Sequence, residues 1–519
     1  MFNLANILDY SAKEYAEKTA LVFGNQRLTY GELNAMANLV ANGLASKGIG
    51  KGDKVVLSCP NLPYFPIVYF GILKAGATAV PINVLLKSRE IAYLLKDSDA
   101  AAYFCFQGTP DLPMAQEGWS GFQEAPDCKH FWIITPETTS PSPITGAQSL
   151  GQLMGGQTSS FDTIVTQFDD TAVILYTSGT TGFPKGAELS HGNMTMNLLG
   201  ARDLAHMKND DVLLVVLPLF HSFGQTVLMN AGFAVGGTLV LIPNFTPDSV
   251  LQAMQTEKVT IFAGVPTMYW ALLAYENKDG GIDIRQIADN LRVGISGAAS
   301  LPVEFIKGFE EKYKIPIMEG YGLSETCPVA TFNHLNKERK PGSVGTPIWG
   351  VEIAVMDNDA NPLAPGEVGE VAVRGHNVMK GYYQKPDATA EAFKGTTWFH
   401  TGDLGRLDED GYLYIVDRVK DMIIRGGYNV YPREIEEILM THPAVSIAAV
   451  IGVPSEPYGE EIMAFIIPKE GETPSADDII AWAKQNMAAY KYPRKVEIRN
   501  ELPISATGKV LKRDLRIEL

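Results

Sequence analysis

A repeated alternation of short apolar runs with stretches of helical periodicity constrains the fold of this chain more than any other feature. Val55–Leu57 and Thr78–Val80 are two such runs, and a stretch of helical spacing lies between them. The alternation predicts parallel β-strands joined by covering helices. The pattern continues at Val173–Tyr176, Val212–Leu217, Thr238–Ile242, Thr260–Ala263 and Leu291–Ile295. With 519 residues, the chain is expected to hold more than one domain.

The pattern changes in the last third of the chain. From Gly342 to Ile415 short strands alternate with turns, which predicts antiparallel or barrel-like structure. The block after Asp417 predicts a small α+β domain. Its expected helices and strands are helices at Pro432–Met440 and Ser475–Met487, the latter capped by Ser475, and strands at Ile447–Ile451 and Glu461–Ile467.

We therefore predict an α/β protein with two domains. The large N-terminal domain, 1–417, is expected to hold two parallel-type sheets with helices and a distorted β-barrel. A hinge over 418–421 would join it to a small, mobile α+β domain over 422–519. The segment Thr135–Ser160 is rich in Thr, Ser, Pro and Gly and is expected to be a surface connection.

Composition and charge exclude several classes of function. The formal net charge is −16, and such a surface does not attract the phosphates of nucleic acids. No apolar run is long enough to span a membrane, so stable membrane insertion is not expected. Met1–Ala20 has the pattern of an amphipathic helix rather than of a signal peptide. The four cysteines lack metal-binding spacing, which predicts reduced thiols and a cytoplasmic location.

The strongest local signal is a segment rich in glycine and hydroxyl groups that directly follows an apolar run. It reads Tyr-Thr-Ser-Gly-Thr-Thr-Gly-Phe-Pro-Lys-Gly and spans 176–186. Glycine lets the backbone approach a polyphosphate closely, and successive N–H groups form a nest for anions. It is not a Walker A loop, because Pro184 precedes the lysine and Gly186 follows it. The candidate phosphate ligands are Thr177, Ser178, Gly179, Thr180, Thr181 and Lys185.

A second motif, Tyr-Gly-Leu-Ser-Glu-Thr at 321–326, completes a resemblance to a known family. The chain resembles the adenylate-forming superfamily of acyl-CoA synthetases, firefly-type luciferases and peptide-synthetase adenylation domains, from Leu28–Leu33 to Thr507–Lys509. The resemblance implies that Tyr321 covers adenine, Ser324 binds the α-phosphate and Glu325 holds Mg²⁺. Serine departs here from the commoner threonine but keeps the hydroxyl group. The other implied nucleotide contacts in and before this motif are Glu319, Gly320 and Gly322.

Two further segments gain roles from the same resemblance. In the segment 296–300, Gly297 would border the acyl group and Ala298 the adenine. In the segment 217–221, His221 would gate the acid pocket. His221 is not expected to act as a general base, because a carboxylate substrate is already ionised near neutral pH.

The implied roles in the C-terminal third follow the order of the chain. Asp403 and Arg418 would bind the ribose and phosphates, and Lys420 stands at the hinge position. Gly427 would line the passage for the pantetheine arm of CoA. Lys509 would reach the carboxylate and the α-phosphate during adenylation, and joins Lys185 and His221 in the candidate catalytic set.

The resemblance implies an ATP-dependent carboxylic acid:CoA ligase that uses Mg²⁺. The acid would be adenylated with release of pyrophosphate, and the small domain would then rotate about Lys420 so that CoA takes the acyl group. Small and apolar residues, with no Arg or Lys, dominate the stretch between Phe220 and Gly237, which favours a medium- to long-chain fatty acid. An aryl acid, a carrier protein as acceptor, luciferase-like chemistry and an inactive nucleotide-binding protein stay open as alternatives. The protein is expected to be a monomer or homodimer.

Overall fold

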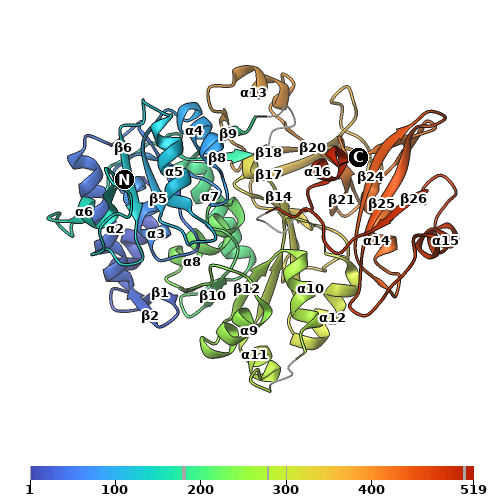
Figure 1. The fold of residues 1–519 in the computed structure, drawn as a ribbon, viewed down its shortest axis with the longest axis horizontal. Coiled ribbons are helices and arrows are strands. Elements are labelled where there is room, and N and C mark those ends of the chain that lie inside the picture. The colour runs from blue at the N-terminus through green and yellow to red at the C-terminus, as the bar shows by residue number, and fades with distance from the viewer. Residues whose placement is uncertain (1, 178–182, 277–279, 300, 506–509, 519) are drawn as a thin grey trace. The chain divides into compact units, whose positions relative to one another are not determined.

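The computed structural model describes residues 2–177, 183–276, 280–299, 301–505 and 510–518. The chain forms two compact units (Figure 1). Unit 1 comprises Met1–Arg339, Pro347–Glu352 and Arg374–Thr397, and unit 2 comprises Lys340–Thr346, Ile353–Val373 and Trp398–Leu519. The hinge expected over 418–421 stays a prediction.

The first sheet of unit 1 has eight strands among the described residues, in the order β19-β9-β8-β4-β3-β5-β6-β7. Neighbours from β8 to β7 pair in parallel, whereas β9 pairs antiparallel with β8 and β19. The strands are β3 (Lys54–Ser58), β4 (Thr78–Pro81), β5 (Ala100–Phe106), β6 (His130–Ile134), β7 (Gln148–Ser149), β8 (Thr171–Thr177), β9 (Lys185–Ser190) and β19 (Gly381–Tyr382). The helices in these connections are α3 (Tyr64–Lys74), α4 (Ser88–Asp97), α5 (Met114–Gln123) and α6 (Leu150–Met154), and α13 (Pro386–Phe393) follows β19.

The prediction of a plain surface connection over Thr135–Ser160 is wrong in part. The segment contains β7 and the short helix α6, and Leu150 and Leu153 are buried. Ser149 caps this helix by accepting a hydrogen bond from the Gln152 amide. A capping box followed by leucines at helical spacing explains why a polar stretch still folds onto the sheet.

The second sheet of unit 1 has nine strands, within the described residues, in the order β16-β15-β14-β13-β12-β10-β11-β1-β2. Its central strands from β1 to β14 are parallel, as the alternation predicts. The strands are β1 (Thr19–Phe23), β2 (Gln26–Thr29), β10 (Val212–Val215), β11 (Thr238–Leu241), β12 (Ile261–Gly264), β13 (Val293–Ser296), β14 (Ile317–Gly322), β15 (Val329–Phe332) and β16 (Thr346–Pro347).

The remaining helices of unit 1 include those within 247–313 that pack around a core in which Leu214, Phe262, Tyr269, Phe309 and Tyr313 are fully buried. These remaining helices are α1 (Asn6–Glu14), α2 (Tyr30–Ser46), α7 (His191–Leu204), the π-helix η1 (Phe223–Asn230), α8 (Ala231–Ala234), α9 (Pro247–Thr256), α10 (Pro266–Ala274), α11 (Ile284–Asn290), α12 (Val303–Tyr313) and the 3₁₀-helix η2 (Ser324–Thr326). In the portion of the chain that is described, no helix is both long and apolar enough to cross a membrane.

Unit 2 holds most of a four-stranded sheet, in the order β17-β18-β20-β21, whose pairs β18–β20 and β20–β21 are antiparallel. A second sheet, β23-β22-β25-β24 with β26 beside β25, carries three helices. The prediction that Ser475 caps a helix is confirmed, because its Oγ accepts from the Asp478 amide at 3.1 Å. The elements are β17 (Val351–Met356), β18 (Gly369–Gly375), β20 (Phe399–Leu407), β21 (Leu413–Arg418), β22 (Ile423–Arg425), β23 (Tyr428–Val430), α14 (Pro432–Leu439), β24 (Val445–Ser455), β25 (Gly459–Pro468), α15 (Ala476–Asn486), β26 (Lys495–Ile498) and α16 (Lys512–Ile517).

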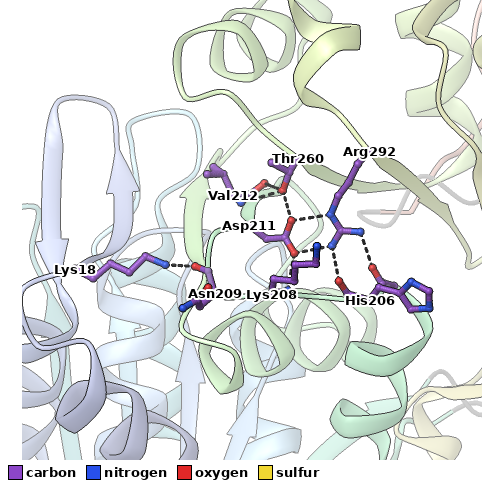
Figure 2. A network of polar contacts seen from close by, with 9 residues as sticks. Lys18, His206, Lys208, Asn209, Asp211, Val212, Thr260 and Arg292 are labelled. Carbon is purple, nitrogen blue, oxygen red and sulfur yellow. Dashed lines mark hydrogen bonds and ion pairs between the residues drawn. The ribbon is translucent and has the colours of Figure 1, made fainter.

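A buried ion pair lies at the amino-terminal edge of the second sheet, just before β10, β12 and β13 (Figure 2). Arg292 donates to both carboxylate oxygens of Asp211, at 2.8 and 2.6 Å, and Thr260 Oγ1 donates to the same carboxylate at 2.7 Å. Burial alone would raise the pKa of Asp211, but the hydrogen bonds from Arg292, Thr260 and the Lys208 amide outweigh it and lower the pKa. Asp211 is therefore a fully compensated buried carboxylate.

Replacing Arg292 by alanine is expected to lower the free energy of unfolding by about 3 kcal/mol, because a buried carboxylate would lose its countercharge. Denaturant titration measures this change. The matched control is Lys307→Ala on α12, whose ion pair with Glu304 is largely exposed and is worth less than about 1 kcal/mol. Equal effects of the two substitutions would contradict the prediction.

His191 ties the N-terminal segment to the start of α7. Its Nδ1 accepts a hydrogen bond from the Leu4 amide at 3.0 Å, and the residue is 1% exposed. Burial, the largest cause, lowers the pKa of His191 from 6.5 to about 4. The unfolded chain therefore binds a proton near pH 6.5 that the folded chain takes up only near pH 4.

Stability is therefore expected to fall as the pH drops from about 6.5 to about 4, by up to about 3 kcal/mol from this residue alone. Urea titrations across this range would give the slope, which should be smaller for His191→Gln, because glutamine keeps an acceptor but cannot be protonated. An unchanged slope in the variant would show that His191 is not the group responsible.

Candidate active site

The glycine- and hydroxyl-rich segment connects two paired antiparallel strands, β8 and β9. Thr177 ends β8 and Lys185 begins β9, and these two residues are paired across the antiparallel ladder. The strand expected before the segment is thus confirmed, and the pairing of Thr177 with Lys185 places these two residues side by side. Ser178, Gly179, Thr180 and Thr181 lie outside the described residues.

Several polar side chains of unit 1 contact Glu325 near the end of β8. Its side chain is buried, with the residue 7% exposed. Thr177 Oγ1 donates to Glu325 Oε1 at 3.1 Å, and the Tyr382 hydroxyl donates to the same atom at 3.0 Å. The Lys185 ammonium lies 5.3 Å from the centre of the Tyr382 ring. Three residues predicted separately from two motifs, Thr177, Lys185 and Glu325, therefore lie together.

Tyr382 belongs to this group but was missed in the sequence. It lies in the short strand β19, which pairs with β9. Burial, followed by the nearby Glu325 carboxylate, raises the pKa of its hydroxyl, which therefore stays protonated and donates. Its only signal in the sequence is a Gly-Tyr-Tyr run far from either motif, and aromatic residues after glycine are too common to single it out.

The carboxylate of Glu325 fits a role in binding Mg²⁺. Both hydrogen bonds that the described residues make to it end on Oε1. Mg²⁺ in nucleotide sites is commonly held by one or two carboxylates together with phosphates and water. Within the described ranges, no cluster of three or more His, Cys, Asp or Glu could hold a metal by itself, so the phosphates would have to supply further ligands.

The end of β14, where the 321–326 motif begins, packs very closely against neighbouring chain segments. A Cβ atom on Gly320 would lie 2.3 Å from the Phe332 ring, and one on Gly322 would lie 1.7 Å from the Pro328 carbonyl oxygen. Only glycine fits at these positions. The strand ends at Gly322, and Ser324 opens the helix η2 that carries Glu325. Tyr321, between the glycines, is paired with Thr331 of β15.

Glu319, which is predicted to lie beside the nucleotide, also makes a hydrogen bond within the protein. Its Oε1 accepts a hydrogen bond from the Leu301 amide at 3.1 Å, and the residue is 5% exposed. It is also paired with Ser296 at the end of β13. The carboxylate thus holds Leu301 against β14.

The backbone directly after β13 includes a residue in an unusual conformation. Ala298 has φ +69°, a left-handed conformation that costs a non-glycine residue energy and often marks a functional site. A Cβ atom on Gly297 would lie 3.0 Å from the Phe223 ring, so the first residue of η1 packs directly on this glycine. Phe223 is the neighbour that the sequence did not reveal.

His221 is neutral in the folded protein. Burial lowers the pKa of its imidazole to about 4. The Phe223 amide donates to Nδ1 at 3.3 Å, so Nδ1 is an acceptor and Nε2 carries the proton. This neutral imidazole lies directly before η1, and its expected role in gating the acid pocket stays a prediction.

In unit 2, the predicted pair Asp403 and Arg418 meets across β20 and β21. Arg418 Nε lies 3.1 Å from Asp403 Oδ1, and the Asp403 side chain is only 7% exposed. Lys420 follows two residues after the end of β21 and is exposed. Lys509 lies outside the described residues.

Gly427 lies in the two-residue turn between β22 and β23. Gly426 and Gly427 have φ +58° and φ +83°, as a tight hairpin turn with two left-handed residues requires. Among the described residues other than its two chain neighbours, no atom lies within 4 Å of a Cβ atom built on Gly427, so these residues leave the space beside it open. This openness is compatible with a passage along the backbone.

The family model described as AMP-binding enzyme matches residues 8–383, and that of the AMP-binding enzyme C-terminal domain matches residues 434–509. A feruloyl-CoA synthase of Amycolatopsis sp is 35% identical over 96% of this chain and 95% of its own length. A long-chain-fatty-acid–CoA ligase of Bacillus subtilis (strain 168) is 35% identical over 99% of this chain and 94% of its own length. The crystal structure of the anthranilate CoA ligase AuaEII with anthranoyl-AMP superposes with a TM-score of 0.91, at 30% identity, covering 100% of this chain and 97% of that one.

Proposed function

Since this chain belongs to the AMP-binding enzyme family and is an acid–thiol ligase, we propose that it activates a monocarboxylic acid as its acyl-adenylate and transfers the acyl group to CoA. The observation that carries the proposal is that Thr177, Lys185 and Glu325 lie together where β8 ends and β9 begins. A cation, a hydroxyl group and a carboxylate beside the glycine- and hydroxyl-rich segment suit a polyphosphate with its metal ion.

In the first step, a carboxylate oxygen forms a bond to the α-phosphorus of ATP while the bond to pyrophosphate breaks. The step joins an anion to a polyanion, so groups that offset negative charge accelerate it. Lys185 would supply a fixed positive charge, and Thr177 would hold Glu325 in place. Mg²⁺ held by Glu325 would neutralise phosphate charge. Asp403 and Arg418 remain the proposed ribose-binding pair.

In the second step, the thiol sulfur of CoA bonds to the acyl carbon and AMP leaves. Gly427, with open space beside its backbone, is the proposed guide for the pantetheine arm. The alternative acceptor is a phosphopantetheinylated carrier protein, which presents the same thiol. Comparing CoA with such a carrier protein at equal thiol concentration would distinguish the two.

For the acid, we propose a medium- to long-chain fatty acid. Every residue of η1 is buried and uncharged, and the stretch from Phe220 to Gly237 has no cation to pair with a second carboxylate. An aryl acid is the second candidate, because the Phe223 ring against Gly297 offers a flat surface for another ring. The feruloyl-CoA synthase is as similar to this chain as the fatty-acid ligase.

The test is pyrophosphate release with ATP, Mg²⁺ and CoA over a panel of octanoate, palmitate, ferulate, benzoate and malonate. Fatty acids are expected to be best and malonate the poorest. A preference for ferulate or benzoate would favour the aryl candidate. Release of ADP and phosphate instead of AMP and pyrophosphate, or no turnover with any acid, would contradict the proposed function.

A further inference from the structure

A single buried amide side chain, that of Asn61, joins the two sheets of unit 1 at their carboxyl-terminal ends. Asn61 lies three residues after β3 and is 3% exposed. Its Nδ2 donates to the carbonyl oxygens of Val215, Leu217 and Ile242, at 3.2, 3.0 and 3.3 Å. Its Oδ1 accepts from the Leu219 amide at 3.0 Å. All four hydrogen bonds of this side chain therefore go to main-chain groups at the ends of β10 and β11 or in the loop after β10.

The partners of Asn61 mark where two parallel strands end. Val215 is the last residue of β10, and Ile242 directly follows β11. Leu217 and Leu219 belong to the irregular loop between β10 and η1. Pro218 lies in this loop and has no N–H to give, so the loop cannot continue the strand ladder. Buried main-chain groups need partners, and Asn61 provides them.

The loop that Asn61 holds leads directly to His221 and Phe223. The His221 amide donates to the Pro218 carbonyl at 3.1 Å, and the Gln225 amide donates to the His221 carbonyl at 3.0 Å. The Phe223 amide donates to His221 Nδ1, and the Phe223 ring packs on Gly297. A shift of the loop at Leu217 or Leu219 would therefore move the imidazole and the ring together.

We propose that Asn61 is a positioning residue for the acid substrate: by fixing the 215–219 backbone, it sets where His221 and Phe223 stand against Gly297. The proposal rests on the proposed function in taking this region as the acid-binding one. Asn61 itself acts only through the loop. It has no part in holding the nucleotide, because its four hydrogen bonds all go to the β10–η1 loop and the end of β11.

The first test compares KM for the acid with KM for ATP. Asn61→Ala removes all four hydrogen bonds, and Asn61→Asp keeps the acceptor for Leu219 but sets a charge against three carbonyl oxygens. Both variants are expected to raise KM for the acid about 10-fold or more, since small displacements of binding groups are costly, while KM for ATP stays within about twofold. The matched control is Asn38→Ala, which removes another buried amide side chain, one that donates to the Ser159 carbonyl. It is expected to leave both KM values unchanged.

The second test measures the order of the 215–219 loop directly, in the absence of substrate. Hydrogen exchange at the Leu219 amide should speed up at least 10-fold in Asn61→Ala and remain close to that of the unaltered protein in Asn61→Asp. Unchanged Leu219 exchange in Asn61→Ala, or parallel changes in both KM values, would overturn the proposal. If Asn61→Ala does not fold, Asn61→Asp alone decides through its KM values. An unaltered protein that never turns over would refute the proposed function, whereas the exchange result would still decide whether Asn61 holds the loop.

Discussion

Glu325→Gln is expected to slow acid-dependent pyrophosphate release by about 100- to 1,000-fold. Glutamine has nearly the same shape and keeps an oxygen for Thr177 and Tyr382, whose hydroxyl groups donate to Glu325 Oε1. It removes the negative charge that would hold Mg²⁺ on the phosphates, so the loss should fall on the chemical step. Single-turnover formation of acyl-adenylate measures it.

The control for this substitution is Glu188→Gln on the neighbouring strand β9. The Glu188 carboxylate accepts a hydrogen bond from Thr171 Oγ1 at 2.9 Å and is assigned no role in the reaction. Its variant should release pyrophosphate within about twofold of the unaltered protein. Raising the Mg²⁺ concentration should partly restore Glu325→Gln. A fully active Glu325→Gln enzyme would remove Glu325 from the reaction.

The second large effect is expected for Lys509→Ala, which should separate the two half-reactions. Formation of acyl-adenylate from acid and ATP should fall by about 100-fold or more, because a positive charge at the reacting anions would be lost. Formation of acyl-CoA from supplied acyl-adenylate should proceed at a rate within a few-fold of the original, since Lys509 is proposed to act only in adenylation. Quenched-flow measurement of each half-reaction gives the two rates.

Lys469→Ala, in the same C-terminal region, is the control and should affect neither half-reaction. Lys469 follows β25 and is exposed, with no role in the proposed reaction. Equal losses in both half-reactions of Lys509→Ala would contradict the proposal that Lys509 acts only in adenylation. They would also weaken the proposed rotation about Lys420, because that rotation is what would take Lys509 away before the thiol enters.

The sequence predicts elements well where one repeating pattern determines them. Parallel strands such as β10 and β12 are apolar throughout because helices cover them on both faces, and this makes them visible as runs. The 135–160 segment was misjudged because its polar composition hides Leu150 and Leu153, which pack a short capped helix onto the first sheet. Composition averages over a segment, whereas packing depends on where its few apolar residues stand.

Site residues were predictable where a motif groups them and not where the fold alone does. Thr177, Lys185 and Glu325 stand in dense motifs, and the structure places them together. Tyr382 and Asn61 come from short segments without such density, and each meets its partners only through tertiary folding. A lone tyrosine or asparagine has no local pattern that distinguishes a solvent-facing side chain from one that holds a catalytic group or a loop.

The Asp211–Arg292 pair has a consequence for how this protein could vary. It lies where β10 and β13 begin, whereas Asn61, His221 and Gly297 cluster where strands of the same sheet finish. Substitutions at the Asp211–Arg292 pair are therefore expected to change thermal stability, and substitutions near His221 and Gly297 to change the choice of acid. Substitutions that adapt the protein to a warmer or colder habitat could therefore accumulate where these strands begin. They would leave unchanged the acid selectivity that we propose is set where the strands end.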